Sequence, residues 1–196
     1  MSKESHEIPE LNKIIVVLGP DRVGKSTYTK ALQQAFQTEG VSTRILHFDG
    51  PKPYHDSPVQ MYLEPLDEII ATVKHSRPEV VICDRGFSEV CFYDKFRRQV
   101  YTSEQWALHA ESVFSSHCKS LDVFLIKREW DWVKPHHRKE IDEIHPYATN
   151  YFKSMQLQNR MNEHHEYYEY MEDYLQNRSS LDYKVISPAS APAGLV

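Results

Sequence analysis

The segment with the clearest chemistry runs from Gly19 to Thr27 and reads G-P-D-R-V-G-K-S-T, which fits the pattern G-x-x-x-x-G-K-[ST]. Its two glycines let the backbone curl so that successive N–H groups point inward and hold a phosphate group. Lys25 stands where such loops carry the lysine that reaches the β- and γ-phosphates, and Ser26 stands where a hydroxyl holds Mg²⁺. The segment therefore predicts a nucleotide site. The residues expected to form it are Gly19, Asp21, Arg22, Val23, Gly24, Lys25, Ser26 and Thr27.

A second polar cluster follows an apolar run later in the chain. The run Val80–Cys83 leads directly into Asp84-Arg85-Gly86-Phe87-Ser88. Ligands of open α/β sheets bind at the carboxyl ends of strands, so Asp84 and Arg85 would emerge beside the phosphate loop if the two strands are neighbours. Asp84 would position Mg²⁺ and its waters, and Arg85 would hold the acceptor phosphate or the phosphoryl group in transfer.

The two clusters narrow the reaction class. A GTPase would need a D-x-x-G motif and an N-K-x-D motif; the segment 84–87 misses the first by one residue, and the second is absent from the sequence. Arg22 favours a kinase over an ATPase, because a cation beside the γ-phosphoryl group stabilises charge that grows in the transition state. We therefore expect ATP and Mg²⁺ as cofactors and direct in-line transfer of the γ-phosphoryl group. The expected catalytic residues are Arg22, Lys25, Asp84 and Arg85, and the expected metal ligands are Ser26 and Asp84.

The rest of the sequence predicts an α/β fold that places both clusters at one edge of a sheet. Four short runs are apolar and continuous, as in strands that are covered on both faces of a parallel sheet, and a fifth candidate, Thr43–Phe48, is less purely apolar. In chain order the five are Ile14–Leu18, Thr43–Phe48, Val80–Ile82, Val123–Ile126 and Val185–Ile186. The stretches between them are long enough for crossover helices. The expected helices are Lys25–Glu39, Pro58–His75, Phe87–Tyr101, Ser103–His117 and Ala148–Asn177.

Three C-terminal features stand apart from this alternation. The segment Arg128–Pro146 combines basic residues with two tryptophans and two prolines, and it is expected to extend beyond the sheet edge. The last helix carries a stripe of large side chains near helical spacing, which predicts a face packed on the core. The stripe consists of Tyr151, Met155, Tyr168, Met171, Tyr174 and Leu175. The tail Pro188–Val196 is rich in proline and alanine and is expected to be loose.

Composition bounds the class and the partners. With 196 residues, 40% of them hydrophobic, the chain suits one domain over residues 1–196. It shows neither a signal-peptide core nor a membrane span, and its three cysteines form no Cys-x-x-Cys pair, so we expect a cytoplasmic protein. A net charge of −5 argues against a general nucleic-acid binder and favours a small nucleotide as partner. The oligomeric state, a homodimer included, stays open.

At these two clusters the sequence resembles the thymidylate kinase family of P-loop nucleoside-monophosphate kinases. The loop is close to that family's G-x-D-R-x-G-K-S-T form, and Asp84-Arg85 with Ser88 and Phe92 matches its D-R segment. The resemblance implies a five-stranded parallel sheet with a lid after the fourth strand, at about residues 128–146. It assigns Arg22 as the catalytic cation, Asp21 to the region of the acceptor sugar, and Arg85 to the acceptor phosphate. The reaction it implies is transfer of the ATP γ-phosphate to a deoxynucleoside monophosphate.

The chain departs from the family pattern on the acceptor side. No arginine follows the second strand, so Lys52 is the candidate for the acceptor phosphate, and Gly86 stands where a larger residue is usual. In deoxynucleoside kinases a carboxylate after the second strand can act as base toward a neutral hydroxyl, and Asp49 occupies that region. The alternatives are therefore a kinase for a deoxynucleoside or for a hydroxyl on a modified base, and an ATP-binding regulator without turnover. The expected acceptor-binding residues are Asp21, Asp49, Lys52, Arg85, Ser88 and Phe92.

Overall fold

The computed structural model describes residues 11–48, 67–69, 71–72, 75–98, 104–116 and 118–187. Its centre is a five-stranded sheet in the order β2-β3-β1-β4-β5, in which every pairing is parallel. The strands are β1 (Leu11–Leu18), β2 (Thr43–His47), β3 (Val80–Asp84), β4 (Cys118–Ile126) and β5 (Tyr183–Ile186). The expected α/β fold with a five-stranded parallel sheet is confirmed.

The register of the central strands brings the two polar clusters together. β1 lies between β3 and β4, and Val17 of β1 pairs with Asp84 of β3. The loop after β1 and the turn after β3 therefore leave the sheet side by side. This is the arrangement expected if the two polar clusters belong to one site. The amide of Arg85 donates to the carbonyl oxygen of Val17 at 3.0 Å, which extends the pairing one residue beyond β3.

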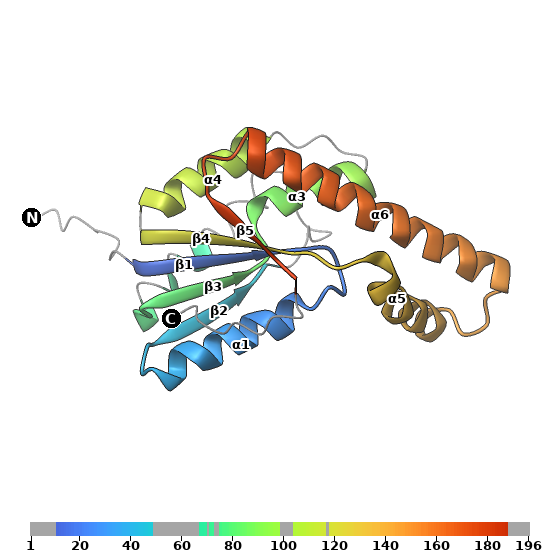
Figure 1. Cartoon of the computed structure of the whole chain (residues 1–196), viewed down its shortest axis with the longest axis horizontal. Coiled ribbons are helices and arrows are strands. Elements are labelled where there is room, and N and C mark those ends of the chain that lie inside the picture. The colour runs from blue at the N-terminus through green and yellow to red at the C-terminus, as the bar shows by residue number, and fades with distance from the viewer. Residues whose placement is uncertain are drawn as a thin grey trace, which may run out of the picture.

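Helices cover both faces of the sheet, which explains why its strands are apolar without alternation. Figure 1 shows α1 on one face and α3, α4 and the second half of α6 on the other. The helices are α1 (Lys25–Thr38), α3 (Phe87–Tyr93), α4 (Glu104–Ser116), α5 (Trp130–Ile144) and α6 (Asn150–Asn177), and a π-helical turn at Asp94–Arg98 continues α3. None of these helices combines the length and apolarity needed to span a bilayer, within the part of the chain that the structure describes.

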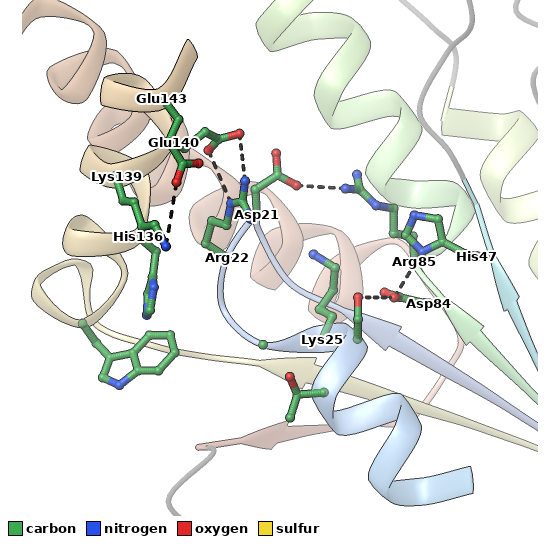
Figure 2. A pocket seen from close by; sticks show the side chains of 14 residues that line it. Asp21, Arg22, Lys25, His47, Asp84, Arg85, His136, Lys139, Glu140 and Glu143 are labelled. Atoms are coloured by element: carbon green, nitrogen blue, oxygen red, sulfur yellow. Dashed lines mark hydrogen bonds and ion pairs between the residues drawn. The ribbon is translucent and has the colours of Figure 1, made fainter. Parts of the chain in front are cut away.

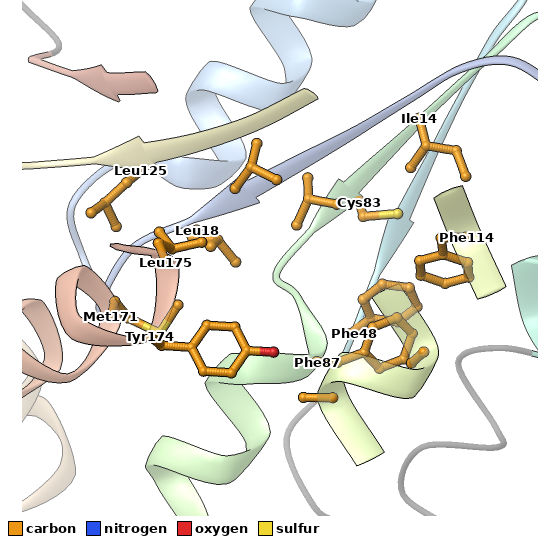
Figure 3. Packing of buried hydrophobic residues seen from close by; sticks show 14 of the residues in the cluster. Ile14, Leu18, Phe48, Cys83, Phe87, Phe114, Leu125, Met171, Tyr174 and Leu175 are labelled. Atoms are coloured by element: carbon orange, nitrogen blue, oxygen red, sulfur yellow. The ribbon is translucent and has the colours of Figure 1, made fainter. Parts of the chain in front are cut away.

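Two apolar clusters lie on the two sides of the sheet. On the α1 side, Leu32 and Phe36 pack with strand residues such as Phe124. On the other side Phe87 stacks on Phe48 with ring centroids 5.8 Å apart and contacts Phe114 at 4.8 Å (Figure 3). The second cluster holds α3, α4 and α6 against the sheet. The turn after β3 leads into this cluster at Phe87 and is thereby fixed in place.

Helix α5 and the first half of α6 project beyond the carboxyl ends of the strands (Figure 1). The segment expected to leave the sheet edge is thus mostly helical, and α5 buries Val133, His137 and Ile141 at four-residue spacing. The prediction that Tyr151 and Met155 face the core is wrong, because they are 82% and 43% exposed in the projecting half of α6. The other members of the stripe are buried, namely Tyr168, Met171, Tyr174 and Leu175.

Several expectations fall on residues outside the described ranges. Asp49, Lys52 and the tail from Pro188 are among these, as is most of the helix expected over 58–75. The long helix expected from Phe87 ends at Tyr93 as an α-helix and changes to π-helical geometry over the next five residues.

Candidate active site

A cavity of about 680 Å³ lies at the carboxyl ends of the strands, between the phosphate loop and helix α5 (Figure 2). It is lined from the loop and the start of α1, from the ends of β2 and β3, and from α5. The lining residues are Asp21, Arg22, Gly24, Lys25, Ser26, Thr27, His47, Asp84, Arg85, Trp132, His136, Lys139, Glu140 and Glu143.

The loop glycines are required by local geometry. Gly24 adopts a left-handed conformation with φ of 96° immediately before α1. A Cβ at Gly19, where φ is 154°, would lie 2.8 Å from Cγ2 of Val23 and 3.1 Å from the carbonyl oxygen of Ile126. A side chain at either place would strain the loop or displace its neighbours, so both glycines serve the curl that the motif predicts.

Lys25 points into the loop and is 6% exposed. Its ammonium group donates to the carbonyl oxygens of Gly19 and, at 2.8 Å, of Pro20. Burial lowers the pKa of Lys25, while the nearby carboxylate of Glu89 acts in the opposite direction. A bound phosphate would offer the ammonium group a charged acceptor in place of these neutral carbonyls.

Asp84 and Ser26, the two expected Mg²⁺ ligands, are in contact with each other. The Ser26 hydroxyl donates to Oδ2 of Asp84 at 2.8 Å, and Nδ1 of His47 lies 3.1 Å from the same oxygen. The other carboxylate oxygen of Asp84 is buried and has no hydrogen-bond partner among the described residues. A buried, unpaired carboxylate oxygen beside a hydroxyl is the donor set that Mg²⁺ takes, with water completing the octahedron. The residues present therefore fit the metal.

Gly86, where the chain departs from the family pattern, has a packing reason. A Cβ there would lie 2.8 Å from Cδ2 of Leu18 and 3.0 Å from Cγ1 of Val16. The turn after β3 is therefore pressed against the end of β1, which leaves no room for a larger residue.

Arg22 is directed toward α5. Its guanidinium group pairs with the carboxylate of Glu140, with N–O distances of 2.9 and 3.3 Å, and this hydrogen bond raises the pKa of Arg22. The residue adopts a left-handed backbone with φ of 69°, which costs a non-glycine residue free energy. The predicted catalytic cation is thus in the cavity and paired with the segment expected to be a lid (Figure 2).

Asp21 joins two arginines. Its Oδ1 accepts from Arg85 at 2.9 Å, and its Oδ2 accepts from Arg97 at 2.6 Å. Burial alone would raise the pKa of Asp21, but Arg85, Lys25 and Arg97 together hold it well below its usual range. Arg97 also grips the carboxylate of Glu163 on α6, with Nε 3.1 Å from each oxygen.

Sequence reasoning missed several residues of this site. Arg97 follows Tyr93 by one helical turn, and its guanidinium lies 4.4 Å from the centre of that ring. In the sequence, Arg97 and the aromatic residues before it bear some likeness to the corresponding helix of deoxynucleoside kinases, but Arg97 is not among the expected site residues. Nothing local to Glu140 points to Arg22, which is 118 residues away, and nothing local to Glu163 points to Arg97, which is 66 residues away.

Two expected acceptor-binding residues lie elsewhere than the cavity lining. Ser88 and Phe92 are on α3, 2% and 3% exposed, and neither is among the described lining residues. The ring of Phe92 packs against the rings of Phe96 and Tyr167, at centroid distances of 5.6 and 5.2 Å. Their role toward an acceptor stays a prediction, as do the roles of Asp49 and Lys52, which lie outside the described ranges.

Comparison with known proteins gives the fold of the chain. No family model matches it, and no curated protein matches it. Among solved structures it is similar to polyphosphate kinase 2 from Arthrobacter aurescens TC1, with a TM-score of 0.56 and 14% sequence identity. The match covers 90% of this chain and 61% of that one, so the chain spans less than two thirds of the other protein's length. The likeness is consistent with the P-loop kinase fold read from the sheet and the loop, and at this identity it concerns the fold alone.

Proposed function

We propose that this protein is an ATP-dependent kinase that transfers the γ-phosphoryl group to a deoxynucleoside monophosphate. The observation that carries the proposal is the convergence of two guanidinium groups, Arg85 and Arg97, on the carboxylate of Asp21. Arg85 and Asp21 line the cavity, and Arg97 reaches the same carboxylate from the π-helical turn after α3. Two adjacent guanidiniums suit a dianionic phosphate, which each can hold through paired hydrogen bonds.

The donor side uses groups whose positions follow from the loop. Lys25 would draw charge from the β- and γ-phosphates, and Arg22 would stabilise the phosphoryl group in transfer after leaving Glu140. Ser26 and Asp84 would hold Mg²⁺, which would neutralise negative charge on the phosphates during transfer. Closure of α5 over the loop would exclude water, which otherwise competes with the acceptor.

The acceptor side favours a monophosphate over a neutral hydroxyl. A nucleoside presents no charge for Arg85 and Arg97 to bind, and burying cations without a counter-ion is costly. Asp21 supplies that counter-ion in this structure, together with Glu163 for Arg97, so an incoming phosphate would share the two arginines with these carboxylates or replace Asp21. Arg97 would then perform the role of the arginine that the family carries after its second strand, a role for which Lys52 is the candidate in the sequence.

The decisive experiment measures ADP formation from ATP and Mg²⁺ with each deoxynucleoside monophosphate, with the matching nucleosides, and with no acceptor. We expect turnover that depends on a monophosphate. Turnover with nucleosides instead would favour the hydroxyl kinase, and ATP binding without turnover would favour the regulator. Because the structural match is named a polyphosphate kinase, polyphosphate is included as an alternative donor.

A variant pair tests the acceptor site itself. Arg97→Gln should raise KM for the monophosphate about 10- to 100-fold with little change in KM for ATP, because a charge-assisted hydrogen bond contributes about 1.5–3 kcal/mol. Arg44→Gln, an exposed position on β2 outside the cavity lining, is the charge-matched control. Equal effects of the two substitutions on the acceptor KM would remove Arg97 from the site.

A further inference from the structure

A buried polar junction lies directly under the phosphate loop. The amide of Gly19 donates to Oη of Tyr167 at 2.7 Å and, more weakly, to Oε1 of Glu89 at 3.3 Å. The Tyr167 hydroxyl in turn donates to the same carboxylate oxygen, and the amide of Gly86 donates to the other oxygen at 3.0 Å. Tyr167 is 0% and Glu89 1% exposed.

The junction ties together three segments that are distant in sequence. Gly19 opens the phosphate loop after β1, Gly86 follows the Asp84-Arg85 pair after β3, and Tyr167 comes from α6, the helix that follows α5. One tyrosine and one glutamate therefore fix the loop that would bind the donor against the turn that would bind the acceptor. Their separation decides whether the two phosphates can meet in line.

Stability alone is a weak reason for such a junction. Taking a carboxylate out of water costs several kcal/mol unless every lone pair is well used, and apolar side chains of similar size often serve packing equally well. The surroundings of Tyr167 are already aromatic, since its ring contacts Phe92 and Tyr93. A phenylalanine would keep those ring contacts and lose only the hydrogen bonds to Gly19 and Glu89.

Gly19, whose amide the junction holds, also accepts a hydrogen bond from Lys25 through its carbonyl oxygen. A phosphate that binds the ammonium group of Lys25 would remove its hydrogen bond to the carbonyl oxygen of Gly19. The hydrogen bonds from the Gly19 amide to Tyr167 and Glu89 do not involve Lys25 and would persist.

We propose that Tyr167 and Glu89 are positioning residues that keep the phosphate loop in place while Lys25 exchanges the Gly19 carbonyl for a phosphate. The proposal rests on the proposed function, because it gives these residues a part in the phosphoryl-transfer geometry. It predicts a defect in turnover rather than in nucleotide affinity, since the loop would still bind phosphate but in a less defined position.

The chain offers a matched pair of variants. Tyr167→Phe removes the hydroxyl under the loop. Tyr174→Phe removes a hydroxyl from another tyrosine of α6 that is also 0% exposed and bonded to a carboxylate, Oε1 of Glu111 at 3.1 Å, away from the loop. Glu89→Gln is the second test, because it keeps the shape and one acceptor oxygen while removing the charge.

Nuclear magnetic resonance can observe the loop without any acceptor. The sequence contains one Leu-Gly pair, Leu18-Gly19, and one Val-Gly pair, Val23-Gly24, so labelling with ¹³C-carbonyl leucine or valine and ¹⁵N-glycine identifies each amide. With Mg²⁺ and a non-hydrolysable ATP analogue bound, Tyr167→Phe should give a Gly24 signal at a position different from that of the unaltered protein. Tyr174→Phe should reproduce the unaltered position.

Kinetics give the second readout. Tyr167→Phe should lower kcat at least about tenfold with KM for ATP within about threefold, and Tyr174→Phe should keep kcat within about twofold, at comparable losses in Tm. Glu89→Gln should resemble Tyr167→Phe. Coincident Gly24 signals for Tyr167→Phe and the unaltered protein, or equal kcat losses in the two tyrosine variants, would overturn the proposal. If the unaltered protein transfers no phosphoryl group to any acceptor, the proposed function fails, and the Gly24 signal alone decides the positioning role.

Discussion

At the scale of single residues, the site contains two arginines in a conformation that is costly for them. Arg22 and Arg85 have φ angles of 69° and 96°. The guanidinium group of each forms an ion pair with a carboxylate, Arg22 with Glu140 and Arg85 with Asp21. Backbone strain at charged residues that line a cavity is typical of functional sites, where the surrounding structure holds a geometry that the chain alone would avoid.

Arg22→Ala tests the catalytic cation. A guanidinium beside the transferring phosphoryl group contributes a few kcal/mol in the transition state, so kcat should fall by more than about tenfold. The measurement is the rate of ADP formation at saturating acceptor. Arg138→Ala, an exposed arginine of α5 outside the cavity lining, should leave kcat unchanged. A loss below tenfold for Arg22→Ala would mean that another group stabilises the transition state.

Asp21→Asn tests the charge network through pH. The pKa of Asp21 is depressed in the fold, so its carboxylate stabilises the protein fully above its unfolded-state pKa of about 4, and this stabilisation is lost as the pH falls from there through the folded-state pKa. The variant should therefore be less stable by about 1–3 kcal/mol at neutral pH. Urea unfolding should show the same gap at pH 7 and 5 and a narrowing gap below about pH 4. A gap independent of pH would contradict the ionic role.

At this scale the sequence predicted the site residues that belong to contiguous motifs and few of those that packing brings together. The loop from Gly19 to Thr27 and the Asp84-Arg85 pair are local motifs whose geometry follows from neighbouring residues. Arg97 meets Asp21 and Glu163 only because the turn after α3 packs beside α6 and the phosphate loop, and sequence spacing carries no information about that packing. Glu89 was missed for the same reason, since its partner Tyr167 lies 78 residues away.

At the scale of elements, the turn after β3 and the end of β1 are fitted to each other. Gly86→Ala would press a methyl group against Leu18 and Val16 and should destabilise the protein by about 1–3 kcal/mol, the usual range for overpacking. Thermal unfolding of Gly86→Ala, Leu18→Ala and the double variant measures the coupling. We expect the double variant to lose less than the sum of the two single losses, because the smaller Leu18 side chain makes room. Strict additivity would show that the contact is relieved elsewhere.

Element types were predictable from periodicity, and element ends were less so. β4 begins at Cys118, five residues before the apolar run that predicted it, because its first half includes polar residues such as Lys119 and Asp122. In α6 the spacing identified the apolar stripe correctly, but spacing does not tell where the packing partner stops. Beyond the sheet edge the same stripe is exposed, as Tyr151 shows.

At the scale of the whole molecule, α5 and α6 form a unit that contacts the phosphate loop through, among others, the Arg22–Glu140 pair. In the proposed function Glu140 would compete with the nucleotide phosphates for Arg22, and its negative charge would oppose their binding. Glu140→Gln should tighten binding of an ATP analogue about two- to fivefold at low salt, in line with an exposed ion pair of up to about 1 kcal/mol.

Calorimetric titration can measure this affinity, with Glu166→Gln, an exposed position on α6, as the control of equal charge change. The gain should shrink at high salt, because screening weakens exposed pairs. A weaker affinity in Glu140→Gln would mean that Glu140 organises Arg22 for the nucleotide instead of holding it back.

The length of α6 has a mechanical consequence. With 28 residues at about 1.5 Å each, the helix is about 42 Å long. Its second half is packed in the core, where Tyr168 and Tyr174 are buried. Its first half projects from the core and packs against α5. The projecting half is about 20 Å long, so a tilt of about 5° where it leaves the core would shift the N-terminal end of α6 by about 2 Å. Tyr167 is buried near the start of the packed half, so the distance between α5 and the phosphate loop would respond to a small rotation of α6 at this residue.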